Sequence, residues 1–181
     1  MKVHQVSTKS KWYSMHRPDF IAEKVGDIDF SYLMSLGITT CFIDLDGTVV
    51  ERGTFKVSET TKGKLKYSGM RIIIATNRPK SRSLKNLKAD MSAAAVVHPV
   101  GAYSKPSRKY YLRALKSLQL DAEETVMIGD RYLQDIWGAN RAGLWSLLVD
   151  KLGKDRTPLD RLVGKIQKIV TRGLVANYRD V

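Results

Sequence analysis

Short apolar runs alternate with segments of helical length along the middle of this chain, and this alternation restricts the possible folds more than any other feature. The apolar or β-branched runs that predict strands are 38–43, 70–76, 93–99, 124–130 and 144–150. The segments with capping residues or glycine stops that predict helices are 29–37, 58–69, 80–89, 106–120 and 131–143. Strands that alternate with helices form a parallel sheet covered on both faces, so we expect an α/β fold with a doubly wound parallel sheet.

The length of 181 residues fits one domain with extensions at its ends. We expect an N-terminal arm at 1–28, an α/β core at 29–150, and a basic C-terminal helix with a tail at 151–181. The last prediction depends on 157–173, where Leu, Val and Ile recur at helical spacing opposite Lys and Arg. Such a helix either packs on the sheet or lies in a membrane interface, and the sequence leaves both readings open.

The chain is strongly basic, with 31 Lys and Arg against 18 Asp and Glu and a net charge of +13. This excess favours polyanionic partners, namely phosphorylated substrates, an anionic membrane surface or nucleic acid. No apolar run approaches the roughly 20 residues of a membrane-spanning helix, and no secretory signal is recognisable. The single cysteine, Cys41, permits no disulfide within the chain. We therefore expect a reducing compartment, the cytoplasm or an organelle matrix, with peripheral attachment to a membrane surface as one option.

Carboxylates stand at the ends of two predicted strands. Asp44 and Asp46 follow the 38–43 run in "FIDLDGT", and Asp130 closes the 124–130 run in "MIGD". The carboxyl ends of parallel strands meet at one edge of the sheet, so these like charges need a cation between them. Hard oxygen ligands suit Mg²⁺, and we expect Asp44, Asp46 and Asp130 to hold it. Asp135, five residues further on, is expected to orient Asp130 or a metal-bound water.

Groups that bind phosphate follow at the same predicted edge. Thr76 offers a hydroxyl and Asn77 an amide at the end of the 70–76 run, and both can hold phosphate oxygens. Lys105 supplies a positive charge that can stabilise a phosphoryl-transfer transition state. Arg78 and other cations nearby in the sequence form either a solvated surface or a patch that attracts a second phosphate.

Four motifs occur in one order: "DLDGTV" at 44–49, "IIIATN" at 72–77, Lys105 ahead of a helix, and "GDRYLQD" at 129–135. In these motifs the chain resembles the haloacid dehalogenase (HAD) superfamily of phosphohydrolases. The resemblance implies a Rossmann-like core and Mg²⁺-dependent hydrolysis of a phosphomonoester.

The same resemblance implies a role for each matching residue. Asp44 corresponds to the nucleophile that becomes an aspartyl phosphate, and Asp46 to the general acid and base. Mg²⁺ is held in such enzymes by the carboxylates that match Asp44 and Asp130 and by the backbone carbonyl that matches Asp46. Thr76 and Lys105 correspond to the phosphate-binding residues.

The predicted elements leave no room for a sizeable cap domain, since residues 49–75 and 78–104 are filled by a loop, helix and strand each. An uncapped site accepts a phosphate carried by something large. The layout, with "RPDF" at 17–20, no cap and the segment at 129–143, resembles the YqeG-type branch of the superfamily, which is related to mitochondrial phosphatidylglycerophosphate phosphatases. This implies an anionic phospholipid headgroup as the substrate.

Two alternatives stay open at this stage. One is a phosphatase that acts on a soluble nucleotide, a sugar phosphate or a phosphoprotein. The other is a nucleic-acid-binding or ribosome-binding module that keeps the fold without turnover. A pure binding module has no need of Asp44, Asp46, Lys105 and Asp130 together. The sequence makes no prediction about the oligomeric state.

Overall fold

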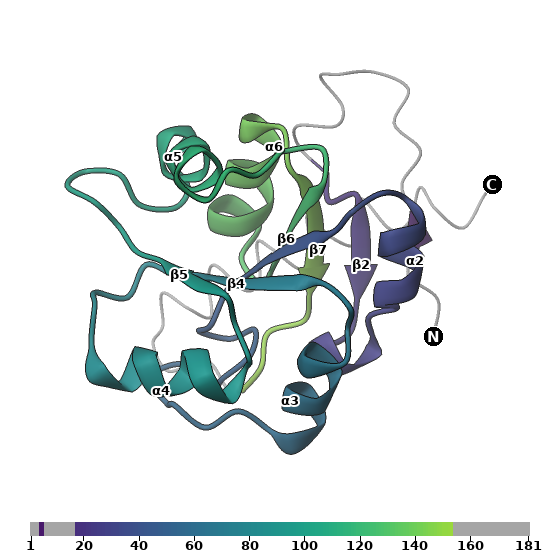
Figure 1. Cartoon of the computed structure of the whole chain (residues 1–181), viewed down its shortest axis with the longest axis vertical. Coiled ribbons are helices and arrows are strands. Elements are labelled where there is room, and N and C mark those ends of the chain that lie inside the picture. Colours follow the sequence, from purple (N-terminus) through teal and green to yellow (C-terminus); the bar gives the residue numbers. More distant parts are fainter. Residues whose placement is uncertain (1–3, 6–16, 154–181) are drawn as a thin grey trace.

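A seven-stranded sheet forms the centre of the molecule in the computed structural model, which describes residues 4–5 and 17–153 (Figure 1). In the order of the sheet, the strands are β1 (His4–Gln5), β2 (Phe20–Ala22), β7 (Trp145–Val149), β6 (Thr125–Gly129), β3 (Thr40–Ile43), β4 (Arg71–Ala75) and β5 (Ala95–Val97). Strands β2 to β7 are parallel, and β1 pairs antiparallel with β2. The predicted α/β fold with a doubly wound parallel sheet is therefore confirmed.

The helices lie on both faces of the sheet, with α5 and α6 on one side and α3 and α4 on the other (Figure 1). Their bounds are α2 (Phe30–Ser35), α3 (Glu59–Lys66), α4 (Arg82–Asp90), α5 (Arg108–Leu118) and α6 (Gly138–Ala142). A 3₁₀ helix, η1 (Val25–Asp27), precedes α2, and a π-helix, η2 (Tyr132–Trp137), runs directly into α6. No helix in the described part is long and apolar enough to cross a membrane.

The predicted caps begin and end several helices. Asp29 and Ser58 accept hydrogen bonds from backbone N–H groups in the first turns of α2 and α3. Gly143 ends α6 with a φ of 87°, a left-handed conformation that favours glycine. These capping residues placed the predicted helix ends within a few residues of the observed ones.

Side chains of the central strands are buried on both faces of the sheet, which explains why the runs are apolar throughout. Phe42, Ile73 and Met127 pack with residues of α5 and α6. Their neighbours along the strands, such as Cys41 and Ile74, pack with residues of α2, α3 and α4. The central strands are therefore packed between two hydrophobic clusters, one on each face of the sheet.

Strand β2 was not predicted. Residues 20–22, expected in the N-terminal arm, pair parallel with β7 and extend the sheet. Three residues are too few to show a periodic pattern, so only the tertiary pairing defines this strand. Residues 1–3 and 6–16 of the expected arm, and the amphipathic helix predicted at 157–173, lie outside the described residues.

The described chain carries no cap domain over the carboxyl edge. Between β3 and β4 the chain forms a loop and α3, and between β4 and β5 it forms α4. The expected absence of a sizeable cap therefore holds for residues 17–153.

Candidate active site

The three strand ends predicted to converge lie side by side. Ile43 of β3 stands opposite Ile74 of β4 and Ile128 of β6. The N–H of Asp44 donates to the carbonyl of Ile128 at 2.9 Å, so the pairing of β3 with β6 continues to Asp44. Asp44 and Asp130 are both buried. The parallel register therefore brings the predicted carboxylates to one edge of the sheet.

Lys105 lies between two carboxylates. Its Nζ is 2.6 Å from Oδ1 of Asp44 and 2.6 Å from Oδ1 of Asp135. Burial lowers the pKa of Lys105, but the negative charges of Asp135 and Asp44 outweigh this effect and raise the pKa above its usual value. The ammonium is therefore charged and held within reach of the predicted nucleophile.

Asn77 positions Lys105. Its Nδ2 donates to the backbone carbonyl of Lys105 at 3.0 Å, and its Oδ1 accepts the N–H of Lys105 at 2.9 Å. The amide predicted to bind phosphate thus forms a two-way clamp between the end of β4 and the Lys105 loop. Its predicted contact with phosphate stays a prediction.

Thr76 is buried at the end of β4. Its hydroxyl oxygen accepts the N–H of Arg78 at 3.0 Å. The hydroxyl hydrogen remains to be donated, and an oxyanion is a suitable acceptor. The predicted phosphate-binding role of Thr76 is compatible with this arrangement.

Three buried carboxylates form a site that fits a divalent cation. Asp44, Asp130 and Asp135 each offer an oxygen, and these oxygens lie within 4.8 Å of one another. Among the described residues the buried charged side chains are these three and Lys105, so buried carboxylates outnumber buried ammonium groups. Burial and the charges of Asp135 and Asp44 raise the pKa of Asp130 to about 7. Hard oxygen donors that carry an excess of negative charge suit Mg²⁺.

The sequence did not show that Asp135 is a buried member of the site in direct contact with Lys105. It is fully buried in η2, pairs with Lys105, and accepts the N–H of Arg131 at 3.1 Å. A Cβ on Gly129 would lie 2.3 Å from Cγ of Asp135, so only glycine lets this carboxylate approach the end of β6. The spacing in "GDRYLQD" was visible in the sequence. The π-helical turn that directs Asp135 inward was not.

The segment after Asp46 supports Asp130. Gly47 has a φ of +88°, and a Cβ there would lie 2.5 Å from Oδ2 of Asp130. The Thr48 hydroxyl donates to Oδ1 of Asp130 at 3.2 Å and accepts the N–H of Asp130 at 3.0 Å. The "DGT" sequence thus joins the β3 and β6 ends tightly.

The carboxylate of Asp46 does not join the other three, although the sequence placed it beside Asp44 at one cation. The contact through its backbone carbonyl, which the resemblance implies, stays a prediction. Nε and Nη2 of Arg78 lie 2.7 Å and 2.6 Å from its two oxygens, and the N–H of Gly53 donates to Oδ1 at 3.0 Å. Burial raises the pKa of Asp46, but the hydrogen bonds from Arg78 and Gly53 outweigh it and lower the pKa overall. Nothing in the sequence pointed to the pairing of Asp46 with Arg78.

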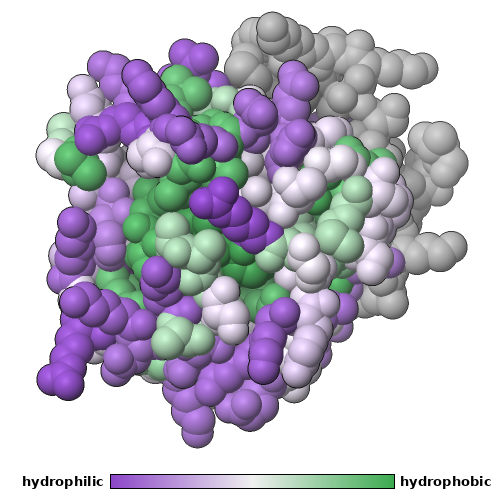
Figure 2. Space-filling view, in the orientation of Figure 1, coloured by the Kyte–Doolittle hydropathy of each residue, from purple (hydrophilic) through white to green (hydrophobic). Residues whose placement is uncertain are grey.

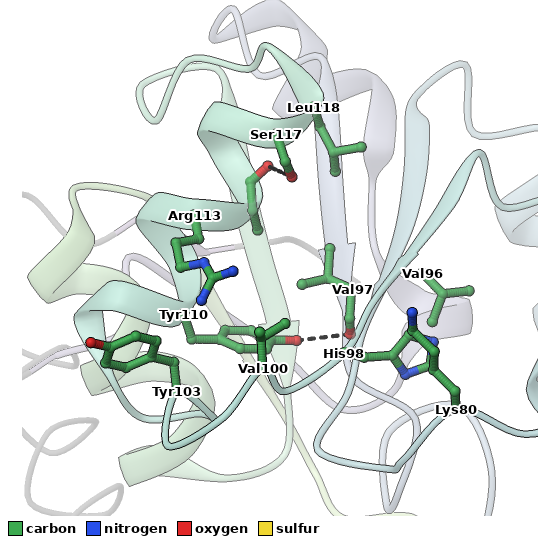
Figure 3. Close-up of a pocket in the computed structure, with 11 residues that line it drawn as sticks. Lys80, Val96, Val97, His98, Val100, Tyr103, Tyr110, Arg113, Ser117 and Leu118 are labelled. Atoms are coloured by element: carbon green, nitrogen blue, oxygen red, sulfur yellow. Dashed lines mark hydrogen bonds between the residues drawn. The ribbon is translucent and has the colours of Figure 1, made fainter.

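A pocket of about 290 Å³ lies beside the site (Figure 3). Its lining combines apolar side chains with cationic or imidazole groups, including Val97, Val100, Lys80, His98 and Arg113. Tyr110 links the pocket to the site, since its hydroxyl lies 3.0 Å from the carbonyl of Val97 and 3.3 Å from that of Thr76. Figure 2 shows apolar surface in a hollow between the two helix layers, bordered by hydrophilic side chains.

Comparison with known proteins gives consistent results. Residues 102–172 match the profile of the HAD-hydrolase-like family. The protein named "Probable phosphatase YqeG" from Bacillus subtilis is 27% identical over 136 residues, which cover 73% of this chain and 76% of that protein. A glyceraldehyde 3-phosphate phosphatase from Pyrococcus abyssi is 32% identical over 85 residues, 45% of this chain and 36% of that protein.

The fold was compared with one solved structure in particular. An uncharacterised protein from Listeria monocytogenes superposes with a TM-score of 0.53 and 18% identity, over 74% of this chain and 99% of that one. At this identity the likeness shows the α/β fold alone.

Proposed function

We propose that this chain, which is similar to HAD-like hydrolases and to a probable phosphatase, hydrolyses phosphomonoesters with Mg²⁺ through an aspartyl phosphate on Asp44. One observation carries this proposal. A buried ammonium, that of Lys105, touches Asp44 and Asp135, and Asp130 completes a group of three carboxylates. A binding module gains nothing from three buried like charges, whereas phosphoryl transfer needs concentrated charge around a nucleophile.

Asp44 is available as the nucleophile. Lys105 contacts Oδ1 of Asp44, and Oδ2 accepts no hydrogen bond from the described residues. Oδ2 attacks the phosphorus, and the bond from phosphorus to the leaving oxygen breaks. Lys105 stabilises the negative charge on the transferring group, and the Thr76 hydroxyl donates to one of its oxygens.

Asp46 transfers the protons in this scheme. It donates a proton to the leaving oxygen, then takes one from a water molecule that attacks the phosphorus of the aspartyl phosphate. Inorganic phosphate leaves, and the carboxylate of Asp44 is regenerated. When bound, Mg²⁺ compensates the excess negative charge and draws electron density from the phosphoryl oxygens. Asp44, Asp130 and the backbone carbonyl of Asp46 would hold it.

We propose phosphatidylglycerophosphate as the substrate, with peripheral attachment of the protein to anionic membranes. The absence of a cap in the described chain favours a phosphate presented by a large molecule or a surface. The neighbouring pocket mixes Val96, Val97 and Leu118 with Lys80 and Arg113, a lining that suits an anionic group attached to an apolar one. The net charge of +13 favours an anionic bilayer.

A panel of phosphomonoesters tests both the proposed phosphatase activity and the proposed lipid substrate. Phosphate release is measured with phosphatidylglycerophosphate in mixed micelles, glycerol phosphate, nucleoside monophosphates and a phosphopeptide, each with Mg²⁺ or EDTA. We expect Mg²⁺-dependent release that is fastest with the lipid. A soluble nucleotide cleaved far faster than the lipid would contradict the lipid substrate. No release from any member by Mg²⁺-loaded protein would contradict the phosphatase proposal.

A further inference from the structure

Arg78 joins three parts of the active-site edge through its side chain and backbone. Its guanidinium donates twice to Asp46 and, through Nη2, to the carbonyl of Thr54 at 3.0 Å. Cζ lies 4.6 Å from the centre of the Phe55 ring. The backbone carbonyl of Arg78 lies 3.2 Å from Nδ1 of His98, which lines the neighbouring pocket. Arg78 therefore stands between the predicted acid, Asp46, and the pocket.

The observed pairing engages the carboxylate of Asp46 with Arg78 instead of a substrate. Arg78 occupies both of its carboxylate oxygens, and the N–H of Gly53 also donates to Oδ1. A carboxyl group that serves a leaving oxygen must direct one oxygen at it within hydrogen-bonding distance. A leaving oxygen would compete with the guanidinium for these oxygens, so Asp46 serves a leaving group best after Arg78 releases at least one of them.

The guanidinium has donor capacity left for another anion. Nη1 is buried and makes no hydrogen bond to any described residue. The ring of Phe55 that covers the guanidinium is itself 47% exposed, so this face lies close to solvent. Planar guanidinium groups bind phosphate and carboxylate oxygens in pairs, and a phosphodiester offers two such oxygens.

We propose that Arg78 determines specificity for substrates that carry a second anionic group beside the scissile phosphate. In the free protein Arg78 binds Asp46, and in the complex it binds the second anion and leaves Asp46 to the leaving oxygen. Recognition of the second anion and release of Asp46 are thus one exchange of partners. This inference rests on the proposed phosphatase function, and a headgroup with a phosphodiester next to a phosphomonoester fits it.

Two soluble substrates that differ in the second anion test the exchange. Glycerophosphoglycerophosphate carries a diester and a monoester, and glycerol phosphate carries the monoester alone. For Arg78→Ala we expect kcat/KM to fall at least tenfold on the first, mainly through KM. On glycerol phosphate, which lacks the second anion, the loss of kcat/KM should be several-fold smaller than on the diester substrate. Arg78→Lys should restore part of the preference, since it keeps the charge without the paired geometry.

Arg71→Gln is the matched control, because Arg71 is exposed at the opposite end of β4 and should leave both substrates unaffected. Melting temperatures of all variants show whether they fold. An equal loss of kcat/KM on both substrates in folded Arg78→Ala would overturn the proposal, since Arg78 would then only hold Asp46 in place.

A binding measurement separates this inference from the proposed function. Asp44→Asn, with Mg²⁺, is titrated with glycerophosphoglycerophosphate with and without Arg78→Ala, and we expect at least tenfold weaker binding when Arg78 is absent. Arg78-dependent binding by a wild-type protein without turnover would support the inference and refute the phosphatase proposal. Equal binding with and without Arg78 would refute the inference even if turnover is observed.

Discussion

Replacing Asp130 by Asn should stabilise the metal-free protein while it removes activity. The buried carboxylate of Asp130 has its pKa raised from 3.8 to about 7 by burial and by the charges of Asp135 and Asp44. One pKa unit corresponds to about 1.4 kcal/mol, so ionised Asp130 costs the folded state about 4 kcal/mol above pH 7. Asn is neutral and keeps an oxygen that can accept the Thr48 hydroxyl.

The raised pKa of Asp130 determines the pH range in which the wild type and Asp130→Asn differ in stability. Because the folded-state pKa lies above the unfolded value, the folded state binds more protons between pH 4 and 7. Wild-type protein in EDTA therefore loses stability as the pH rises through this window. The gain from Asp130→Asn should be about 4 kcal/mol at pH 8 and below about 1 kcal/mol at pH 4.

Urea unfolding in EDTA at pH 4, 6 and 8 measures this difference, with Asp121→Asn as a surface control. At pH 8 the melting temperature of Asp130→Asn should be raised by roughly 8–16 °C. Mg²⁺ should stabilise the wild type and have little effect on the variant. An equal free energy of unfolding for wild type and variant at pH 8 would refute the claim that the carboxylate cluster is electrostatically strained without a cation.

Two further substitutions test how the site is held together. Gly129→Ala places a Cβ 2.3 Å from Cγ of Asp135. It should lower the free energy of unfolding by about 1–3 kcal/mol and remove most activity. Gly63→Ala is the control, because nothing lies within 4 Å of its Cβ, and it should be neutral or slightly stabilising. Lys105→Met leaves Asp44 and Asp135 buried without their shared cation, which should cost about 3–5 kcal/mol at pH 8 by urea unfolding. Part of that loss should return as the pH falls and Asp135 takes up a proton, and a pH-independent loss would contradict this account.

The carboxyl edge of the sheet was predictable because it follows from chain order. Strand-length apolar runs define where β3, β4 and β6 end, and parallel pairing brings the next residues together. For this reason Asp44, Thr76 and Asp130 were placed correctly. Lys105 was also placed correctly, because it follows β5 and precedes a helix at the same edge.

Features that depend on side-chain direction could not be predicted in this way. The pairing of Asp46 with Arg78 joins residues from two loops, and nothing in either loop marks the partner. The inward position of Asp135 depends on a π-helical turn, which has the same apolar pattern as an α-helix at this length. The clamp between Asn77 and Lys105 likewise appears only when the two loops are folded.

Trapping the phosphorylated enzyme tests the central claim most directly. Wild-type protein is mixed with a phosphomonoester labelled on phosphorus in the presence of Mg²⁺, quenched in acid, and digested for peptide mapping. The account predicts label on the peptide that contains Asp44, and none with Asp44→Asn or with EDTA. Phosphate release by the wild type without label on that peptide, or undiminished release by Asp44→Asn, would contradict it.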